Sequence, residues 1–233
     1  MKSYLVQTPK FVQRIFPKRI WAFPNSENKL YLTFDDGPIP EVTPWVLDTL
    51  KKHNAKATFF CIGDNIAKHP EIFKRIISEG HAVGNHTFNH LNGKKTDPKT
   101  YAKNVDKGQF IMEQEILSMG KTIPTSEENE TGVHVGLFRP PYGQMTSAQA
   151  KSVQGKGYQI VMWNVLSADY DTTISEEKCF KNVAESMKPG SIVVFHDSLK
   201  AQKNMQYALP KVLDVIAVNG WSCEKIQQPK NEN

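Results

Sequence analysis

Short apolar, β-prone segments alternate with longer segments of helical periodicity along almost the whole chain. About seven such repeats are present, which is typical of parallel strands joined by helical crossovers. The predicted strands are residues 30–34, 57–62, 81–84, 135–138, 158–165, 191–195 and 222–226. The predicted helices are residues 41–53, 66–79, 97–119, 146–155, 175–187 and 204–218. The pattern predicts an α/β fold, and periodicity alone does not distinguish an open sheet from a closed barrel.

The chain has a suitable size for one such fold. Its 233 residues are 39% hydrophobic and 23% charged, which excludes disordered, collagen-like and disulfide-scaffold proteins. We expect one domain over residues 25–233, preceded by a basic and apolar arm over residues 1–24. Residues 121–133, which hold three glutamates, are expected to form an exposed loop.

Several features bear on where the protein works and with what. No apolar run approaches the ~20 residues of a membrane-spanning helix, and the N-terminus lacks a continuous apolar signal segment. Cys61, Cys179 and Cys223 are odd in number and widely spaced, which favours reduced, buried thiols and a cytoplasmic location. The formal charge of +5 comes without a basic stripe or a nucleic-acid-binding motif. We therefore expect no nucleic-acid partner, and we expect a monomer.

The N-terminal arm allows two interpretations. Phe11, Ile15 and Phe16 stand among basic residues, which is typical of an amphipathic segment that lies on an anionic membrane. Pro17 would break a continuous helix at that point. The alternative is an arm that packs across the domain. The sequence leaves peripheral membrane contact through this arm open.

Two carboxylates end the first predicted strand, in the segment T-F-D-D-G-P at residues 33–38. The carboxyl ends of parallel strands carry the active sites of such folds. Neighbouring strand residues point in opposite directions, so Asp35 and Asp36 should differ in environment and role. A turn-forming or helix-capping pair of aspartates is the alternative.

Two histidines follow the third predicted strand, in the segment H-T-F-N-H at residues 86–90. On a helical turn, His86 and His90 would face the same way and could bind one ion. Two imidazoles and one carboxylate give three protein ligands and leave positions open for water, which is the catalytic rather than the structural pattern. Taken alone, this histidine spacing is only moderately specific for a metal.

Three further polar segments follow strands with the same polarity. Residues 139–143 read R-P-P-Y-G, where Arg139 could orient a carboxylate and a backbone N–H could face a developing oxyanion. His196 ends an apolar strand and would titrate near neutral pH, and Asp169 could fix the tautomer of an imidazole. Each could instead be a surface turn, a satisfied rim histidine or an ordinary loop aspartate. Together the five segments supply a base, three metal ligands, an orienting arginine and an acid.

This set of segments resembles the polysaccharide deacetylase family, the NodB-homology domain of carbohydrate esterase family 4. The T-F-D-D-G-P, H-[ST]-x-x-H and R-P-P-Y-G blocks are intact, and the resemblance covers residues 30–226. It implies a distorted (β/α)7 barrel, with residues 25–233 as the catalytic domain. The implied activity is metal-dependent hydrolysis of N-acetyl groups on amino sugars or polysaccharides, so the partner is an N-acetylated carbohydrate.

The resemblance also implies which residues form the metal site and the base. Asp36, His86 and His90 would hold one divalent ion. Zinc is the first choice, and mixed nitrogen and oxygen ligands also admit Co2+, Ni2+ or Mn2+. Asp35 would be the catalytic base, and Arg139 would orient it.

The remaining implied roles concern the acid and the substrate. His196 would be the catalytic acid, held by Asp169, and the N–H of Tyr142 would serve the oxyanion. The resemblance places four residues at the substrate: Pro141, Tyr142, Tyr170 and Val194.

Two blocks depart from the family pattern. The usual D-x-x-D-W reads L-S-A-D-Y at residues 166–170, and the usual L-x-H reads V-F-H at residues 194–196. Both changes adjoin the acyl pocket of the family, which leaves the substrate preference open. One alternative is a deacylase that removes acetyl or formyl groups from a small or lipid-linked N-acyl compound. Another is a non-catalytic carbohydrate-binding protein on a deacetylase scaffold.

Overall fold

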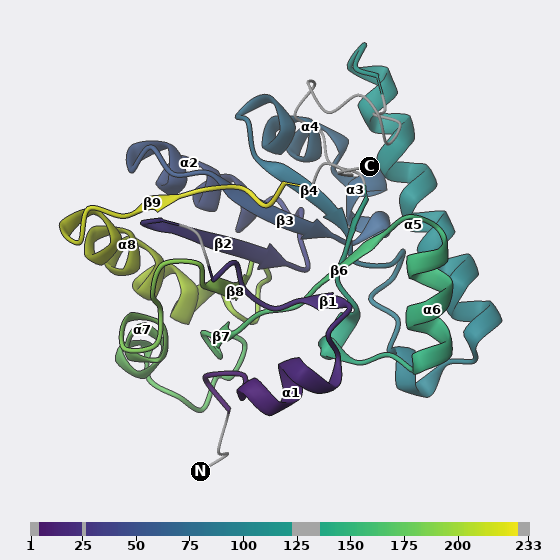
Figure 1. Ribbon diagram of the computed structural model, residues 1–233. Coiled ribbons are helices and arrows are strands. Elements are labelled where there is room, and N and C mark those ends of the chain that lie inside the picture. The colour runs from purple at the N-terminus through teal and green to yellow at the C-terminus, as the bar shows by residue number, and fades with distance from the viewer. Residues whose placement is uncertain (1–4, 25–26, 123–135, 228–233) are drawn as a thin grey trace.

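The apolar, β-prone segments form the strands of one parallel sheet (Figure 1). The computed structural model describes residues 5–24, 27–122 and 136–227. The strands are β1 (Arg19–Ile20), β2 (Lys29–Asp35), β3 (Ala57–Cys61), β4 (Ala82–Asn85), β5 (Leu137–Phe138), β6 (Gln159–Val161), β7 (Val165–Leu166), β8 (Ile192–His196) and β9 (Ser222–Cys223). Their order is β1-β6-β5-β4-β3-β2-β8-β7, β9 pairs with β2, and the ladders between them are parallel. The predicted α/β class is confirmed.

Helices cover the outer side of the curved sheet (Figure 1). They are α2 (Thr43–Lys52), α3 (Gly63–Lys68), α4 (Pro70–Ser78), α5 (Pro98–Ser118), α6 (Ser147–Gly155), α7 (Glu176–Ala184) and α8 (Gln202–Val218), whereas α1 (Lys10–Ile15) belongs to the N-terminal arm and has no buried residue. The main apolar core lies between this helical layer and β2, β3 and β8, where Leu32, Phe34 and Phe195 are fully buried. Each such side chain contributes about 1.5–3 kcal/mol when it leaves water, so these three strands are firmly held.

Two predicted elements are divided in the structure. Residues 66–79 were expected as one helix, but α3 and α4 are separated at His69, whose φ of −133° and ψ of 55° are not helical. Pro70 disfavours the helical conformation of the residue before it, which accounts for the break. Residues 158–165 were expected as one strand, but β6 and β7 lie at different places in the strand order.

The three cysteines are free and buried, as predicted. Most of the predicted glutamate-rich loop lies outside the described residues. None of the helices in the described ranges combines the length and hydropathy that crossing a bilayer requires.

The N-terminal arm connects the two ends of the strand order (Figure 1). Gln7 forms an antiparallel bridge with Val165 of β7, and the parallel pair of β1 and β6 lies at the other end. The helix α1 ends before Pro17, as expected from the missing N–H of proline. The arm therefore packs across the domain over residues 5–24. The division of the chain at residue 24 stays a prediction.

Candidate active site

The strand ends that carry the polar segments lie next to one another in the sheet. Asp35 at the end of β2 is in register with His196 at the end of β8. On the other side, β3 and β4 follow β2, and Asn85 of β4 is in register with Phe138 of β5. The parallel register therefore brings the five predicted segments to one edge of the sheet, as expected for the carboxyl ends of parallel strands.

The predicted metal ligands converge. Asp36, His86 and His90 each offer one ligand atom, and these atoms lie within 4.8 Å of one another. Asp36 Oδ1 is 3.2 Å from His90 Nε2 and 3.7 Å from His86 Nε2. The same oxygen is buried and has no hydrogen-bond partner among the described residues. A buried carboxylate oxygen without a partner is costly, and a bound cation would satisfy it.

The surroundings of His86 favour the state that binds a metal. Its Nδ1 lies 2.7 Å from the Arg139 carbonyl oxygen, which can only accept, so Nδ1 carries the proton and Nε2 is left with a lone pair. Burial lowers the pKa of His86 to about 3, helped by His90 and opposed by Asp36, so the ring is neutral at pH 7. The donor set of two imidazoles and a carboxylate thus fits a divalent ion such as zinc.

The histidines converge by a different local geometry from the one expected. Residues 87–89 form a turn rather than a helix, and Thr87 and His90 have φ values of 67° and 57°. Thr87 N donates to Asn85 Oδ1 at 2.7 Å, and Leu91 N donates to Thr87 Oγ1 at 3.1 Å. The helical-turn prediction is therefore wrong. The ring centroids of His86 and His90 nevertheless lie 5.1 Å apart, close enough for both rings to bind one ion.

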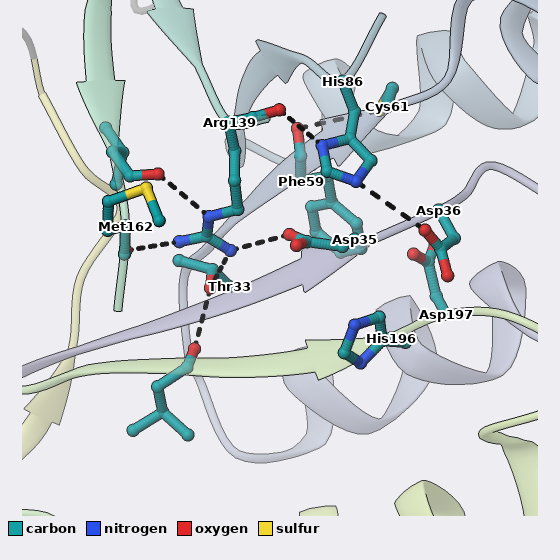
Figure 2. A network of polar contacts seen from close by, with 12 residues as sticks. Thr33, Asp35, Asp36, Phe59, Cys61, His86, Arg139, Met162, His196 and Asp197 are labelled. Atoms are coloured by element: carbon teal, nitrogen blue, oxygen red, sulfur yellow. Dashed lines mark hydrogen bonds and ion pairs between the residues drawn. The ribbon is translucent and has the colours of Figure 1, made fainter. Parts of the chain in front are cut away.

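Arg139 is fully buried and contacts the second carboxylate (Figure 2). Its Nη1 donates to Asp35 Oδ1 at 2.6 Å and to Thr33 Oγ1 at 2.7 Å. Its Nε and Nη2 donate to the carbonyl oxygens of Val161 and Met162, at the point where the chain leaves β6. This fixed guanidinium balances the charge of Asp35 and sets its orientation.

The fourth and fifth segments meet through a histidine–carboxylate pair. His196 Nδ1 lies 2.7 Å from Asp169 Oδ1, and the His196 backbone N–H donates to Asp169 Oδ2. Burial alone would lower the pKa of His196, but the charge and hydrogen bond of Asp169, together with Asp36 and Asp35, raise it to about 10. The imidazole is thus held in its protonated form, with Nε2 left to donate.

The R-P-P-Y-G loop places an aromatic ring at the mouth of the site. Tyr142 is 60% exposed, and its ring centroid lies 4.5 Å from that of His90. Its φ of 59° lies in the left-handed region, where a non-glycine residue is strained. Gly143 N donates to the Pro140 carbonyl and Gln144 N donates to that of Pro141, which holds the turn in place.

The three positions that depart from the family pattern, Leu166, Tyr170 and Val194, lie in one apolar cluster. Val194 is fully buried in a small apolar cluster with Leu166 and Ala168, and Tyr170 packs against this cluster. The Tyr170 ring centroid is 5.1 Å from that of His196, in an edge-on arrangement. The apolar cluster therefore borders the histidine–carboxylate pair.

Backbone strain is concentrated at this edge of the sheet. Seven non-glycine residues in the described ranges have a positive φ, and five of them belong to the site segments: Asp36, Thr87, His90, Tyr142 and Ala168. Such conformations cost about 1–3 kcal/mol each and persist only where the surroundings impose them. Their clustering supports a functional role for this edge.

Asp197 holds the turn that carries the two carboxylates, and no role was predicted for it from the sequence. Its Oδ1 accepts from the N–H of Gly37 at 3.0 Å, and its Oδ2 accepts from Thr43 Oγ1 at 2.6 Å. Burial raises the pKa of Asp197 to about 8, although both hydrogen bonds oppose the shift. The signal in the sequence was an aspartate directly after His196 at a strand end. Its partners are more than 150 residues away, so no local pattern identifies them.

We expect Gly37→Ala to destabilise the protein and to impair the site. A Cβ at this position would lie 1.9 Å from Asp197 Oδ2, and the hydrogen bonds of Asp197 keep that carboxylate from moving away. Overpacking of this kind costs about 1–3 kcal/mol of the free energy of unfolding, measured by urea denaturation. The matched control is Gly155→Ala in α6, where nothing lies within 4 Å of the new Cβ and stability should not fall. Equal stability of both variants would contradict the proposed crowding.

Comparison with known proteins gives consistent matches. A family profile described as polysaccharide deacetylase matches residues 23–161, more than half of the chain. A peptidoglycan-N-acetylglucosamine deacetylase of Bacillus cereus is 38% identical over 78% of this chain and 61% of its own length. The chain thus spans less than two thirds of that relative. A second protein of the same name and organism is 35% identical, over 86% of this chain and 87% of its own.

A chitooligosaccharide deacetylase of Bradyrhizobium sp. is 31% identical over 81% of this chain and 79% of its own length. Among solved structures, the Bc1960 peptidoglycan N-acetylglucosamine deacetylase in complex with 4-naphthalen-1-yl-N-oxidanyl-benzamide superposes with a TM-score of 0.80. It is 31% identical, and the match covers 94% of this chain and 95% of that one. The predicted distorted (β/α)7 barrel is confirmed by this agreement.

Proposed function

The chain belongs to the polysaccharide deacetylase family, and on this premise we propose that it is a metal-dependent hydrolase that removes N-acetyl groups from amino sugars. The resemblance predicted from the five segments is thereby confirmed. The observation that carries the proposal is the convergence of the ligand atoms of Asp36, His86 and His90, at the strand end that also carries Asp35. The relatives named above act on peptidoglycan and chitooligosaccharides, so the substrate class is an N-acetylated carbohydrate.

Asp36, His86 and His90 would hold one divalent ion, with zinc as the first choice. When bound, such an ion supplies a Lewis acid that polarises the amide carbonyl and activates water. Two of the three residues that would hold it are already held in place by hydrogen bonds. His86 is set by the Arg139 carbonyl, and the Asp36 carbonyl accepts from Asn65 Nδ2 at 2.7 Å.

Asp35 is the general base in this proposal. The Asp35 side chain has an exposure of only 4%. It precedes the metal ligand Asp36 directly in the chain. Arg139 keeps the Oδ1 atom fixed at 2.6 Å, so the other oxygen is free to take a proton from the attacking water. Arg139 is a positioning residue, because it contacts the base rather than the substrate.

His196 is the general acid, and the backbone N–H of Tyr142 donates to the developing oxyanion. Asp169 fixes His196 so that Nε2 carries the transferable proton, which goes to the leaving amine. One well-placed oxyanion donor is worth about 3–4 kcal/mol of transition-state stabilisation. Of the four predicted substrate residues, Tyr142 and Tyr170 would contact the substrate, whereas Pro141 and Val194 are buried and would act only through their neighbours. The products are acetate and a free amino sugar.

We expect Asp169→Asn to move the alkaline limb of activity to lower pH. In the wild type the pKa of His196 is raised from 6.5 to about 10, so the acid stays protonated until the pH passes that value. The ion pair of His196 with Asp169 contributes its full stabilisation of the fold below pH 6.5, and this contribution is lost as the pH rises through about 10. Without the carboxylate charge, the limb should shift down by about 1–3 pH units, as seen in a pH profile of kcat. An unchanged limb would mean that His196 is not the acid.

A substrate panel tests the proposed function. Chitin oligomers, peptidoglycan fragments and nucleotide- or lipid-linked amino sugars would be assayed for released acetate, with N-formyl analogues assayed for formate. We expect acetate from at least one N-acetylated sugar. Formate release with no acetate release would favour the alternative deformylase activity. Binding of sugars without any release would favour a non-catalytic carbohydrate-binding protein, which the complete set of base, ligands and acid argues against.

The remaining expectations concern the state of the protein in the cell. The monomeric state and the cytoplasmic location stay predictions. Size-exclusion chromatography with light scattering tests the first, and cell fractionation tests the second.

A further inference from the structure

The excess positive charge of the chain is confined to its N-terminal arm. Residues 1–24 hold five of the 29 lysines and arginines and none of the 24 aspartates and glutamates. Subtracting these five leaves 24 basic and 24 acidic residues, so the rest of the chain has no formal net charge. Charge concentrated in one segment attracts an anionic partner to that segment rather than to the whole surface.

Large apolar side chains are exposed on the same arm. Nine large apolar side chains of the described residues are exposed, and four of them lie between residues 5 and 16. These are Leu5 (69% exposed), Phe11 (63%), Ile15 (63%) and Phe16 (37%). Single exposed apolar residues are ordinary, but a group of them beside exposed Lys10, Arg14 and Lys18 marks an interaction surface.

The arm is fastened to the domain on both sides of this surface. Leu166 N donates to the Val6 carbonyl at 2.8 Å, and Thr8 N donates to the Asn164 carbonyl at 3.0 Å. At the other end, β1 pairs with β6. The helix between these attachments, α1, has no buried residue. The exposed side chains are therefore presented on a fixed backbone, and a partner does not have to order a free tail.

A groove lined in part by cationic side chains lies next to this surface. It has a volume of about 370 Å3 and runs between the arm and α6. Phe16 and Ile160 line it together with Lys18, Arg19 and Lys151, and its lining residues include no acid. A groove lined by apolar and cationic side chains is complementary to a phosphate group attached to a hydrocarbon chain.

We propose that residues 5–19 are a docking face for an anionic lipid bilayer, with the groove beside α6 receiving a lipid phosphate. A soluble polyanion would pair with Lys10, Arg14 and Lys18 but would leave Phe11 and Ile15 in water. A bilayer takes up both, because apolar side chains enter the boundary between head groups and acyl chains while the cations remain among the phosphates. This proposal does not depend on the catalytic one.

Flotation of the full chain with lipid vesicles tests the docking face. We expect binding to vesicles of phosphatidylcholine mixed with phosphatidylglycerol, weak binding to pure phosphatidylcholine, and release at high salt. The variant Lys10→Gln/Arg14→Gln/Lys18→Gln should bind about 100-fold more weakly, because each cation near the surface contributes about fivefold. The variant Phe11→Ser/Ile15→Ser should lose at least about tenfold even at low salt.

Two matched variants remove the same chemistry from other surfaces. Lys51→Gln/Lys52→Gln/Lys178→Gln removes three exposed cations, and Phe110→Ser/Leu117→Ser removes two exposed apolar side chains of α5. Both should bind vesicles like the wild type. The proposal would be overturned if these control variants lost as much vesicle binding as the arm variants. So would wild-type binding in Phe11→Ser/Ile15→Ser, since the partner would then be a polyanion recognised by charge alone.

Discussion

Replacing Asp35 by Asn is expected to lower kcat by about 10^2–10^4-fold and to leave metal binding unchanged. The asparagine has the same shape and keeps an oxygen that can accept from Arg139 Nη1, which lies 2.6 Å from the carboxylate in the wild type. It has lost the basicity needed to take a proton from water. Acetate release gives kcat, and metal content per chain, measured by elemental analysis, gives occupancy.

The control for this variant is Thr33→Val. Thr33 Oγ1 accepts from the same Arg139 Nη1 at 2.7 Å, so the change disturbs the arginine while the carboxylate stays in place. We expect some loss of thermal stability and a much smaller loss of kcat than in Asp35→Asn. Near-normal turnover of Asp35→Asn would reassign the general base. Equal losses in both variants would mean that arginine anchoring, rather than proton transfer, limits the reaction.

Replacing His90 by Ala is expected to abolish metal binding and activity together. The variant leaves two of the three ligands and should weaken affinity by at least about 100-fold, since even outer-sphere changes cost 10–100-fold. The His90 side chain is 26% exposed in the wild type, so the fold should tolerate its removal. His86→Ala should have the same effect on metal binding, with an added loss of stability because His86 is buried. Calorimetric titration with Zn2+ measures the affinity.

A matched histidine lies elsewhere on the surface. His53 follows the end of α2, has a side-chain exposure of 25%, and its Nε2 lies 3.3 Å from Asp214 Oδ1. His53→Ala should bind metal and release acetate like the wild type. Full activity of His90→Ala in the presence of a chelator would contradict a role for this site.

The positions of the candidate catalytic residues could be predicted because each polar segment directly follows a strand. Parallel strands bring their carboxyl ends together, so Asp35, His86 and His196 could be assigned to one edge without knowing the strand order. The strand order itself was not predictable, since it depends on packing between distant segments. The break at His69 could have been predicted from Pro70, because a proline disfavours a helical residue before it.

Other parts of the site depend on contacts that leave no local pattern. The hydrogen bonds of Asp197 to Gly37 and Thr43 join segments about 150–160 residues apart. The helical turn expected at His86 is replaced by a turn that Asn85 stabilises through a side-chain hydrogen bond. Asparagine commonly forms such local bonds, but their presence here depends on β4 ending at that residue.

The most direct test is to titrate Zn2+ into protein treated with a chelator while acetate release from a chitooligosaccharide is measured. The proposed site predicts no release from the metal-free protein and activity that rises in proportion to bound ion. Both should reach a plateau at one ion per chain, and the His90→Ala variant should show neither. Two results would contradict the assignment of Asp36, His86 and His90 as the catalytic metal site. One is full acetate release from the metal-free protein. The other is Zn2+-dependent acetate release by the His90→Ala variant, which would place the catalytic ion at another site.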